Sequence, residues 1–197
     1  MMITGLILCG GRGTRMGNAD KGLQAFLGRP MVAHVIERLA PQVASMLINA
    51  NRSQKEYAAF GLPVIADATD EYAGPLAGML AGMQYCTTSL LMSVPCDSPL
   101  LPADLVARLH EAMIDAGAEL AVPVTDDGNS RQTHPVFCLA DVRLKYDLAN
   151  YLARGERRFV AWLTSRNCVQ VPFDNEESFR NLNTLEELRA LEATQGR

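Results

Sequence analysis

The chain lacks the features that would place it in a membrane or in a disulfide-stabilised secreted fold. No apolar run approaches the roughly 20 residues that span a bilayer. Residues 1–5 show no charged start leading into a long apolar stretch, as a signal peptide would. The five cysteines are odd in number, lie far apart and form no Cys-x-x-Cys motif, which disfavours both a disulfide framework and a zinc knuckle. We therefore expect a cytoplasmic protein without membrane contact.

The chain also lacks an excess of basic charge and any sign of a second domain. Its 197 residues carry 18 Lys and Arg against 22 Asp and Glu, a net charge of −4. This balance argues against binding nucleic acid or anionic membranes through a broad basic surface. No repeat, low-complexity tract or linker interrupts the sequence, so we expect residues 1–197 to form one domain with a sizeable core.

Strand-like apolar runs alternate with helical patterns along the whole chain. The runs predict strands at 3–9, 46–49, 64–66, 90–94, 120–124, 136–139 and 169–171. Apolar spacing and proline starts predict helices at 30–40, 75–85, 102–113, 141–152 and 156–164, and capping-box patterns at Ser53 and Thr184 predict two more. This alternation predicts a three-layer α/β fold, in which helices cover both faces of a mostly parallel sheet.

Two glycines fall within the predicted helix at 75–85. Gly78 and Gly82 weaken that helix, because glycine has a low helix propensity. They lie four residues apart on one helical face, where the missing Cβ atoms allow another backbone or a ligand to come close.

Candidate ligand-binding residues follow four of the predicted strands. In open parallel sheets, ligands bind beyond the carboxyl ends of the strands. Residues 10–21, Asn49, Asp67 and Asp97 occupy such positions, and we expect them to share one edge of the sheet. Taken alone, Asn49 and Asp67 fit solvated strand ends, whereas Asp97 fits equally a Mg²⁺ ligand and a turn residue before a proline.

The loop after the first predicted strand has the composition of a phosphate-binding loop. Four glycines let backbone N–H groups approach phosphate oxygens, and Arg12, Arg15 and Lys21 add positive charge. It is neither a P-loop nor a complete dinucleotide fingerprint, because Gly22 follows the lysine and Met16 replaces the third glycine. We predict a triphosphate site, with a charged surface turn as the less favoured alternative.

Three later features each admit two interpretations. His134, in a polar loop, is either a substrate contact or a solvated residue. The adjacent cations at 157–158 and the asparagines at 181 and 183 form either a charged helix start and a turn, or contacts to a second anionic substrate.

Several of these segments resemble a known enzyme family. The run LCGGRGTRMG at 8–17, followed by DK at 20–21, resembles the LxGGxxxRMGxxDK signature of sugar-nucleotide-type nucleotidyltransferases. The segments NANR, GPLAGM, PCDSP, GERR and NLNT, spread in order over the chain, are similar to those of molybdenum cofactor guanylyltransferases, the MobA family. The resemblance implies a Rossmann-like nucleotidyltransferase fold, with nucleotide bound by the N-terminal part and pterin by the C-terminal part.

The resemblance also implies a reaction and a set of residues. The family transfers GMP from Mg-GTP, with Mn²⁺ as a possible substitute, to molybdenum-molybdopterin, which gives the guanine dinucleotide cofactor and pyrophosphate. The resemblance matches Lys21 to the lysine of the nucleotide loop and Asp97 to the magnesium ligand. Because three cations and a strand-end carboxylate fall at one predicted sheet edge, we expect Arg15, Lys21 and Asp97 to be the catalytic residues. The implied nucleotide contacts are Leu8, Cys9, Gly10, Gly11, Lys21, Asn49, Asp67 and Asp97, and the implied pterin contacts are Arg157, Asn181 and Asn183.

Two details of the loop bear on the choice of nucleotide. Cys9 stands where the family usually has alanine, and we expect no loss of function because both residues are small. The related cytidylyltransferases usually read Leu-Ala-Ala-Gly here, so Gly10 and Gly11 favour guanine over cytosine.

Two other functions stay open at this point. One is a nucleotidyltransferase of the same fold that uses CTP or a sugar phosphate, and the other is a non-catalytic nucleotide-binding module. The presence of both Asp97 and Lys21 argues against the module. As partners we expect GTP, molybdenum-molybdopterin and proteins of cofactor biosynthesis or molybdoenzymes, and we expect a monomer that binds neither nucleic acid nor membrane.

Overall fold

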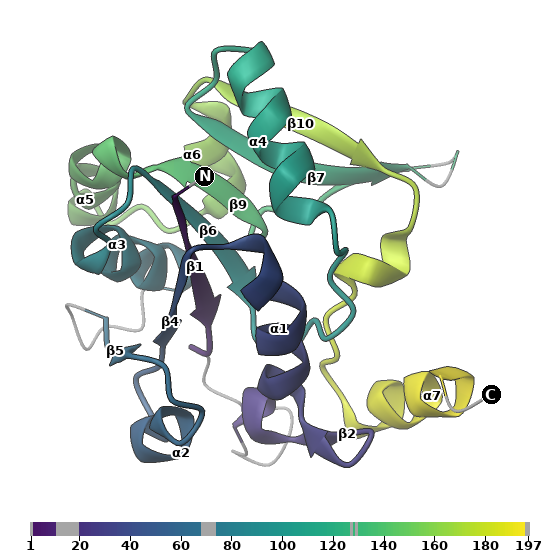
Figure 1. The fold of residues 1–197 in the computed structure, drawn as a ribbon. Coiled ribbons are helices and arrows are strands. Elements are labelled where there is room, and N and C mark those ends of the chain that lie inside the picture. The colour runs from purple at the N-terminus through teal and green to yellow at the C-terminus, as the bar shows by residue number, and fades with distance from the viewer. Residues whose placement is uncertain (1, 11–19, 68–73, 127, 129, 196–197) are drawn as a thin grey trace.

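A mixed sheet runs through the middle of the molecule, with helices on both of its faces (Figure 1). The computed structural model describes residues 2–10, 20–67, 74–126, 128 and 130–195. Two predicted site residues, Gly11 and Arg15, lie outside the described residues. The strand order is β10-β7-β9-β6-β1-β4-β5, and β8 pairs with β7. The prediction of a three-layer α/β fold is therefore confirmed.

The described elements have the following bounds. The strands are β1 (Ile3–Leu8), β2 (Ala25–Phe26), β3 (Arg29–Pro30), β4 (Ser45–Asn49), β5 (Val64–Ile65), β6 (Leu90–Pro95), β7 (Leu120–Asp126), β8 (Arg131–Thr133), β9 (Cys138–Asp141) and β10 (Cys168–Phe173). The α-helices are α1 (Met31–Leu39), α2 (Gln54–Ala58), α3 (Pro75–Tyr85), α4 (Leu105–Asp115), α5 (Lys145–Ala153), α6 (Phe159–Thr164) and α7 (Leu185–Gln195). Short 3₁₀ turns are η2 (Lys21–Leu23), η3 (Ala40–Gln42), η4 (Val142–Leu144) and η5 (Glu176–Phe179). None of these helices combines the length and apolar content that a bilayer crossing requires.

Each predicted strand and helix has a counterpart in the structure, but the sheet is less parallel than a simple alternation implies. Strand β9 lies antiparallel between β6 and β7, and β8 pairs antiparallel with β7. The short hairpin of β2 and β3 was not predicted, nor was β8. An antiparallel strand inserted into a parallel sheet has the same apolar pattern as its neighbours, so the sequence could not reveal its direction.

The two predicted capping boxes have different outcomes. At α7 the box is confirmed: Glu187 N–H donates to Thr184 Oγ1 at 3.1 Å, and Thr184 N–H donates to Glu187 Oε2 at 3.0 Å. At α2 it is wrong, because Ser53 has a left-handed backbone (φ 50°, ψ 32°) and makes no side-chain cap bond. Instead, Gln54 Nε2 donates to Ala50 O at 3.0 Å and closes the turn before the helix.

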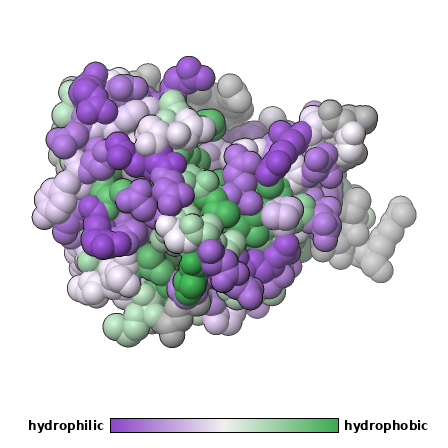
Figure 2. Space-filling model, turned by 90° about the horizontal axis from the view of Figure 1, so that it is seen from above, coloured by the Kyte–Doolittle hydropathy of each residue, from purple (hydrophilic) through white to green (hydrophobic). Residues whose placement is uncertain are grey.

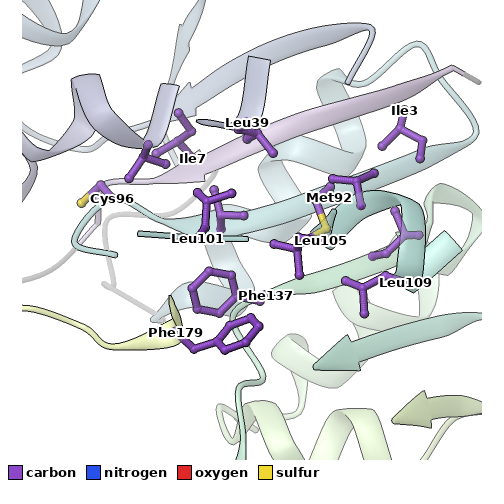
Figure 3. Packing of buried hydrophobic residues seen from close by; sticks show 14 of the residues in the cluster. Ile3, Ile7, Leu39, Met92, Cys96, Leu101, Leu105, Leu109, Phe137 and Phe179 are labelled. Carbon is purple, nitrogen blue, oxygen red and sulfur yellow. The ribbon is translucent and has the colours of Figure 1, made fainter. Parts of the chain in front are cut away.

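Alternate residues of β1 supply two apolar clusters on opposite faces of the sheet. Ile3 and Ile7 belong to the cluster that includes α1 and α4 (Figure 3). Leu6 and Leu8 belong to the cluster that includes α3, α5 and α6. Because β1 is buried on both faces, its sequence is an apolar run without alternating polar residues.

A third apolar cluster anchors the C-terminal helix. Leu188 and Leu191 of α7 pack with Leu182, with Phe26 of the hairpin and with Met31. The Leu27 N–H also donates to Glu192 Oε1 at 2.7 Å. These contacts fix α7 against the hairpin of β2 and β3.

The parallel pairing of β1 brings three strand ends to one edge of the sheet. Strand β1 pairs with β4 up to Leu8 opposite Asn49, and with β6 up to Leu8 opposite Pro95. The expectation that residues after these strands share an edge is confirmed; in Figure 1 this edge lies toward the bottom. Figure 2 shows the opposite face of the molecule, seen from above, on the side where β1 begins. Hydrophilic residues predominate on this face, and hydrophobic residues are exposed between them near the centre.

The two glycines of α3 allow the close approach that their spacing predicted. A Cβ on Gly82 would lie 2.5 Å from Leu6 Cδ2, and a Cβ on Gly78 would lie 2.2 Å from Asn49 Oδ1. Real Cβ atoms essentially never come this close to such neighbours. Helix α3 therefore rests directly on β1 and β4 at these two positions.

Replacing Gly82 by alanine tests this packing. We expect Gly82→Ala to lower the free energy of unfolding by about 1 kcal/mol, because overpacking a core costs roughly 1–3 kcal/mol and exceeds the roughly 1 kcal/mol that alanine gains in helix propensity. The urea midpoint measures the change, and Gln84→Ala, an exposed change on the same helix, is the control. A midpoint raised by Gly82→Ala would contradict the close packing.

Candidate active site

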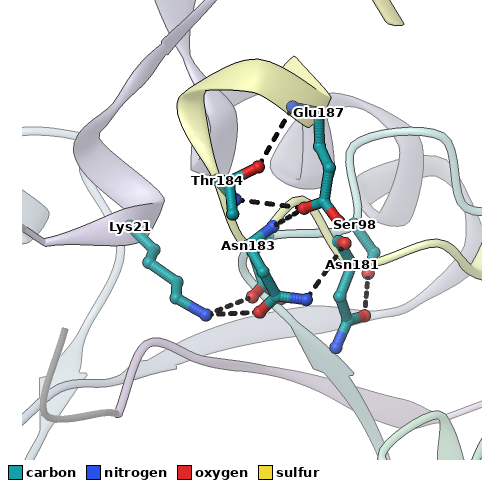
Figure 4. A network of polar contacts seen from close by, with 7 residues as sticks. Lys21, Ser98, Asn181, Asn183, Thr184 and Glu187 are labelled. Atoms are coloured by element: carbon teal, nitrogen blue, oxygen red, sulfur yellow. Dashed lines mark hydrogen bonds and ion pairs between the residues drawn. The ribbon is translucent and has the colours of Figure 1, made fainter. Parts of the chain in front are cut away.

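The ammonium group of Lys21 joins two distant parts of the chain. Lys21 opens η2, Asp97 lies two residues beyond β6, and Asn183 lies two residues before α7. Lys21 Nζ donates to Asn183 Oδ1 at 2.6 Å and lies 3.5 Å from Asp97 Oδ2 (Figure 4). We call these three side chains the ammonium cluster. Residues that the sequence placed in different roles thus meet at one point.

Hydrogen bonds fix the C-terminal segment beside the end of β6. Leu182 N–H donates to the carbonyl of Asp97 at 2.9 Å, and Ser98 Oγ donates to Asn181 Oδ1 at 2.7 Å. The capping box of α7 adds a third bond, in which Asn183 N–H donates to Glu187 Oε2 at 2.7 Å (Figure 4). The position of Asn183 is therefore fixed by its own backbone bond to Glu187, by the backbone bond of the neighbouring Leu182 to Asp97, and by its side-chain bond to Lys21.

Asp97 is a nearly buried carboxylate beside the Lys21 ammonium. The residue is 8% exposed. Burial raises the pKa of Asp97 above its ordinary value, while the nearby Lys21 ammonium and a bond from the residue's own backbone N–H partly offset the rise. Additional positive charge near this buried carboxylate would favour its ionised form.

Two asparagines hold the carboxylate of Asp67 at the ends of β4 and β5. Asn49 Nδ2 donates to Asp67 Oδ1 and Asn51 Nδ2 donates to Asp67 Oδ2, both at 2.9 Å. Asn51 Oδ1 also accepts the backbone N–H of Asp67 at 2.8 Å. We call these three residues the amide cluster. The prediction that Asn49 and Asp67 lie at the same edge is confirmed, and the structure adds Asn51.

The end of β1 connects the two clusters. On one side, Cys96 N–H donates to the carbonyl of Leu8 at 3.1 Å; on the other, Cys9 N–H donates to the carbonyl of Asn49 at 2.8 Å. A Cβ on Gly10 would lie 3.8 Å from Asn49 Oδ1, so the chain passes next to the amide cluster as it leaves the strand. The predicted nucleotide residues 8–10 therefore lie between the two clusters.

Helix α2 supports the other end of the glycine-rich segment. The buried Tyr57 hydroxyl donates to Asp20 Oδ1, the residue before the Lys21 turn. A Cβ on Gly22 would lie 2.5 Å from the Tyr57 oxygen and 3.1 Å from Cys96 Sγ. The missing Cβ at position 22 lets the turn lie this close to Tyr57 of α2 and to Cys96, the residue after β6.

A cavity of about 680 Å³ borders the ammonium cluster on its C-terminal side. Asn181 and Asn183 line it together with His134 and Phe179. Its other lining residues are Gln132, Thr133, Pro135, Val136, Phe137, Glu176, Glu177 and Arg180. Because Asn183 also accepts the Lys21 bond, the cavity and the ammonium cluster share one side chain.

His134 is buried, contrary to its interpretation as a solvated loop residue. Its ring stacks on Phe179 with centroids 4.6 Å apart, and its Nε2 lies 2.8 Å from Thr125 Oγ1. Burial lowers the pKa of His134, which favours the neutral imidazole. The residue therefore forms part of the cavity wall as a stacked ring whose pKa shift favours its neutral form.

Arg157 lies apart from the residues that the Lys21 ammonium contacts. It belongs to the connection between α5 and α6, where its Nη1 donates to the carbonyls of Leu152 and Glu156 at 2.7 Å each. It lies outside the lining of the cavity. Of the three predicted pterin contacts, the structure thus brings Asn181 and Asn183 together at the cavity, without Arg157.

Three residues of the site had no assigned role in the sequence prediction or only an open one. Asn51 was part of the quoted segment NANR, but no local pattern indicated its bond to Asp67. Ser98 lies within PCDSP, and its bond to Asn181 spans 83 residues. For His134 the apolar residues that follow it were the available signal of burial.

The part of the chain that the structure describes contains no group of three or more His, Cys, Asp or Glu side chains that could hold a metal ion. Asp97 is the buried carboxylate that the sequence prediction named as a magnesium ligand. Mg²⁺ is commonly held by one or two carboxylates and substrate phosphates.

Solved structures share this fold at low sequence identity. Molybdopterin-guanine dinucleotide biosynthesis protein A from Archaeoglobus fulgidus superposes with a TM-score of 0.81 at 21% identity, covering 98% of each chain. The 4-diphosphocytidyl-2C-methyl-D-erythritol synthase of Anaerococcus prevotii gives 0.77 at 12% identity, covering 100% of this chain and 99% of that one. These likenesses establish the nucleotidyltransferase fold.

Sequence comparison is more specific. The model of the MobA-like NTP transferase domain matches residues 5–168. The molybdenum cofactor guanylyltransferase of Ralstonia nicotianae is 54% identical, covering 96% of this chain and 95% of the relative. The protein of the same name from Bordetella pertussis is 46% identical, covering 97% of each chain. The chain therefore belongs to the MobA-like NTP transferase family, together with the molybdenum cofactor guanylyltransferases.

Proposed function

We propose that the protein transfers GMP from Mg-GTP to molybdenum-molybdopterin, which forms the guanine dinucleotide cofactor and releases pyrophosphate. Relatives about half identical over nearly the whole chain carry the name molybdenum cofactor guanylyltransferase. The observation that carries the proposal is the contact of Lys21 with both Asp97 and Asn183. The Lys21 ammonium lies at the end of the glycine-rich segment and contacts both the strand-end carboxylate of Asp97 and Asn183 in the wall of the cavity.

In this proposal the edge between the clusters binds GTP. The amide cluster contributes Asn49 and Asp67 as contacts to the guanine nucleotide, and the backbone at residues 8–10 passes between base and phosphates. Lys21 faces the phosphates, where an ammonium acts as a compact positive charge. Gly11 and Arg15, which lie outside the described residues, stay predicted members of the same phosphate site.

The residues present fit a magnesium ion at Asp97. The carboxylate is nearly buried at the strand edge, and burial raises its pKa despite the lysine, so it favours a further cation. When bound, Mg²⁺ (or Mn²⁺) supplies charge neutralisation at the phosphate oxygens. Asp97 would hold it, with the remaining ligands coming from phosphates and water.

The chemistry requires positioning and charge stabilisation more than proton transfer. A terminal phosphate oxygen of the pterin attacks the α-phosphorus of GTP; the new P–O bond forms as the bond to the bridging oxygen breaks and pyrophosphate takes its electron pair. The nucleophile is already anionic, so no general base is needed. Lys21 stabilises the negative charge on the leaving pyrophosphate, and Asn183 fixes the direction of that ammonium.

The cavity beside the ammonium cluster is proposed as the acceptor site. Its volume of about 680 Å³ falls within the range of small-molecule sites, roughly 300–1,000 Å³. The amide nitrogen of Asn181 points away from Ser98 (Figure 4). An acceptor substrate in the cavity would therefore meet this nitrogen as a hydrogen-bond donor. Arg157 stays a predicted contact for an anionic part of the acceptor, reached from outside the cavity lining.

The assignment extends to the organisation of the chain. We propose that residues 1–197 act as one nucleotidyltransferase domain, with nucleotide bound by its N-terminal part and pterin by its C-terminal part. We further propose a monomer that exchanges its substrate and product with proteins of cofactor biosynthesis or with molybdoenzymes.

The choice of nucleotide is the direct test of this function. With Mg²⁺ and molybdenum-molybdopterin present, we expect pyrophosphate release at least about 100-fold faster from GTP than from CTP, since a buried hydrogen-bonding site rejects a base with the wrong donors. Pyrophosphate and the dinucleotide product are both measured. Turnover of CTP in place of GTP would contradict guanylyl transfer, and nucleotide binding without pyrophosphate release would identify a non-catalytic module.

Removing the charge of Asp97 tests its place in the reaction. Asp97→Asn keeps the size of the side chain but removes the anionic oxygen ligand, so we expect the turnover number to fall by at least about 100-fold. The matched control is Asp104→Asn, a change at an exposed carboxylate before α4. A rate near wild type for Asp97→Asn in saturating magnesium would remove Asp97 from the mechanism.

The acceptor site is tested by changing one donor without disturbing its support. Asn181→Asp still accepts the Ser98 bond but replaces the amide donor with a negative charge. We expect the KM for molybdenum-molybdopterin to rise at least about tenfold while the Kd for GTP stays unchanged, because a hydrogen bond is lost and the anionic acceptor is repelled. Asn167→Ala, an exposed change outside the cavity lining that removes a side-chain bond to the carbonyl of Gly117, is the control. An unchanged acceptor KM would place the acceptor elsewhere.

A further inference from the structure

We propose that Asn51 is a positioning residue that gives the site its preference for guanine by holding the Asp67 carboxylate in a fixed orientation. The inference rests on the proposed function, in that it takes Asp67 as a contact to the guanine nucleotide. It concerns a residue that touches Asp67 and acts on the base through it.

Asn51 holds Asp67 at two points. Its amide nitrogen donates to Asp67 Oδ2 at 2.9 Å, and its amide oxygen accepts the Asp67 backbone N–H at 2.8 Å. Asn49 Nδ2 holds the other carboxylate oxygen, Oδ1, also at 2.9 Å. With each oxygen bound by a different amide, the carboxylate cannot rotate about its own axis without losing a bond.

Both asparagines are themselves fixed by the fold. Asn49 is 2% exposed and its side-chain oxygen lies against Gly78, the helical glycine that makes room for it. Asn51 belongs to the turn before α2, where Gln54 Nε2 donates to Ala50 O at 3.0 Å and Ser53 takes a left-handed backbone. The amide cluster is therefore preorganised on the carboxyl ends of β4 and β5.

A carboxylate held in this way matches the guanine edge and no other common base. An ionised carboxylate only accepts hydrogen bonds, and its two oxygens together offer about four acceptor sites. Two of these are used by Asn49 and Asn51, which leaves one on each oxygen for a ligand. Guanine presents two adjacent donors, N1–H and the 2-amino group, whereas the corresponding edges of cytosine and adenine mix donors with acceptors.

Inosine triphosphate isolates this interaction, because hypoxanthine keeps N1–H and lacks the 2-amino group. By equilibrium binding in the presence of magnesium, we expect the wild-type protein to bind GTP at least about tenfold more tightly than ITP. In Asn51→Ala the carboxylate is held only by Asn49, so we expect the affinity for GTP to fall about tenfold, that for ITP to change little, and the GTP/ITP ratio to approach one.

Two further variants separate positioning from folding. Asn51→Asp keeps the size of the side chain but faces Asp67 with a second carboxylate, so we expect its GTP/ITP affinity ratio also to approach one. This variant provides the test if the alanine variant folds poorly. Asn167→Ala, which removes a single exposed bond to the carbonyl of Gly117 on a distant turn, should leave the ratio unchanged. Circular dichroism and thermal midpoints of each variant report whether the fold is intact.

The outcomes distinguish this inference from the proposed function. A parallel loss of affinity for GTP and ITP, with the ratio preserved, would mean that Asn51 only supports the fold and would overturn the proposal. Equal binding of GTP and ITP by the wild type, with weaker binding of 2′-deoxy-GTP, would place Asp67 at the ribose and also overturn it. A GTP/ITP ratio that collapses in the Asn51 variants supports the inference even if the wild type releases no pyrophosphate, a result that would count against guanylyl transfer alone.

Discussion

The parallel pairing of β1 with β4 on one side and β6 on the other is the constraint on which the rest of the site depends. It places Leu8 opposite both Asn49 and Pro95, so three segments that are distant in the sequence end at one edge of the sheet. Parallel strands need long crossover connections, and here these are the helices that bury both faces of β1. The apolar sequence of β1 and the polar residues beyond it are two consequences of the same arrangement.

The sheet edge alone does not complete the candidate site, because the side chains that border its cavity near Lys21 come from the C-terminal part of the chain. The Lys21–Asn183 bond joins residues 162 positions apart. Its geometry depends on the docking of α7 against the β2–β3 hairpin, on the Leu182 bond to the Asp97 carbonyl and on the Glu187 cap. Contacts of this kind order a segment that lies outside the sheet, and they connect the stability of the C-terminal helix with the position of the Lys21 ammonium.

What the sequence could reveal follows from whether a feature is local. Strand ends, helical periodicity and the Thr184 capping box depend on residues that are close together in the sequence, and each was predicted. The antiparallel direction of β9 could not be predicted in this way, because β9 has the same apolar pattern as a parallel strand. Burial of His134 depends on Phe179, 45 positions away, and the Asn51 bond depends on Asp67 reaching the same edge. Ser53 failed as a cap because the turn closed through Gln54 Nε2 instead.

The distances around Lys21 bear on the proposed binding of a triphosphate with its cation. The ammonium lies 2.6 Å from the Asn183 oxygen and 3.5 Å from the Asp97 oxygen, so it is held mainly by a neutral amide. Burial raises the pKa of Asp97, and the Lys21 ammonium at this distance only partly offsets the rise. A tighter Lys21–Asp97 pair would satisfy both charges and leave nothing for a ligand to gain. The longer separation leaves the carboxylate able to interact with a further cation and the ammonium able to interact with phosphate oxygens, and the proposed substrate Mg-GTP would supply both.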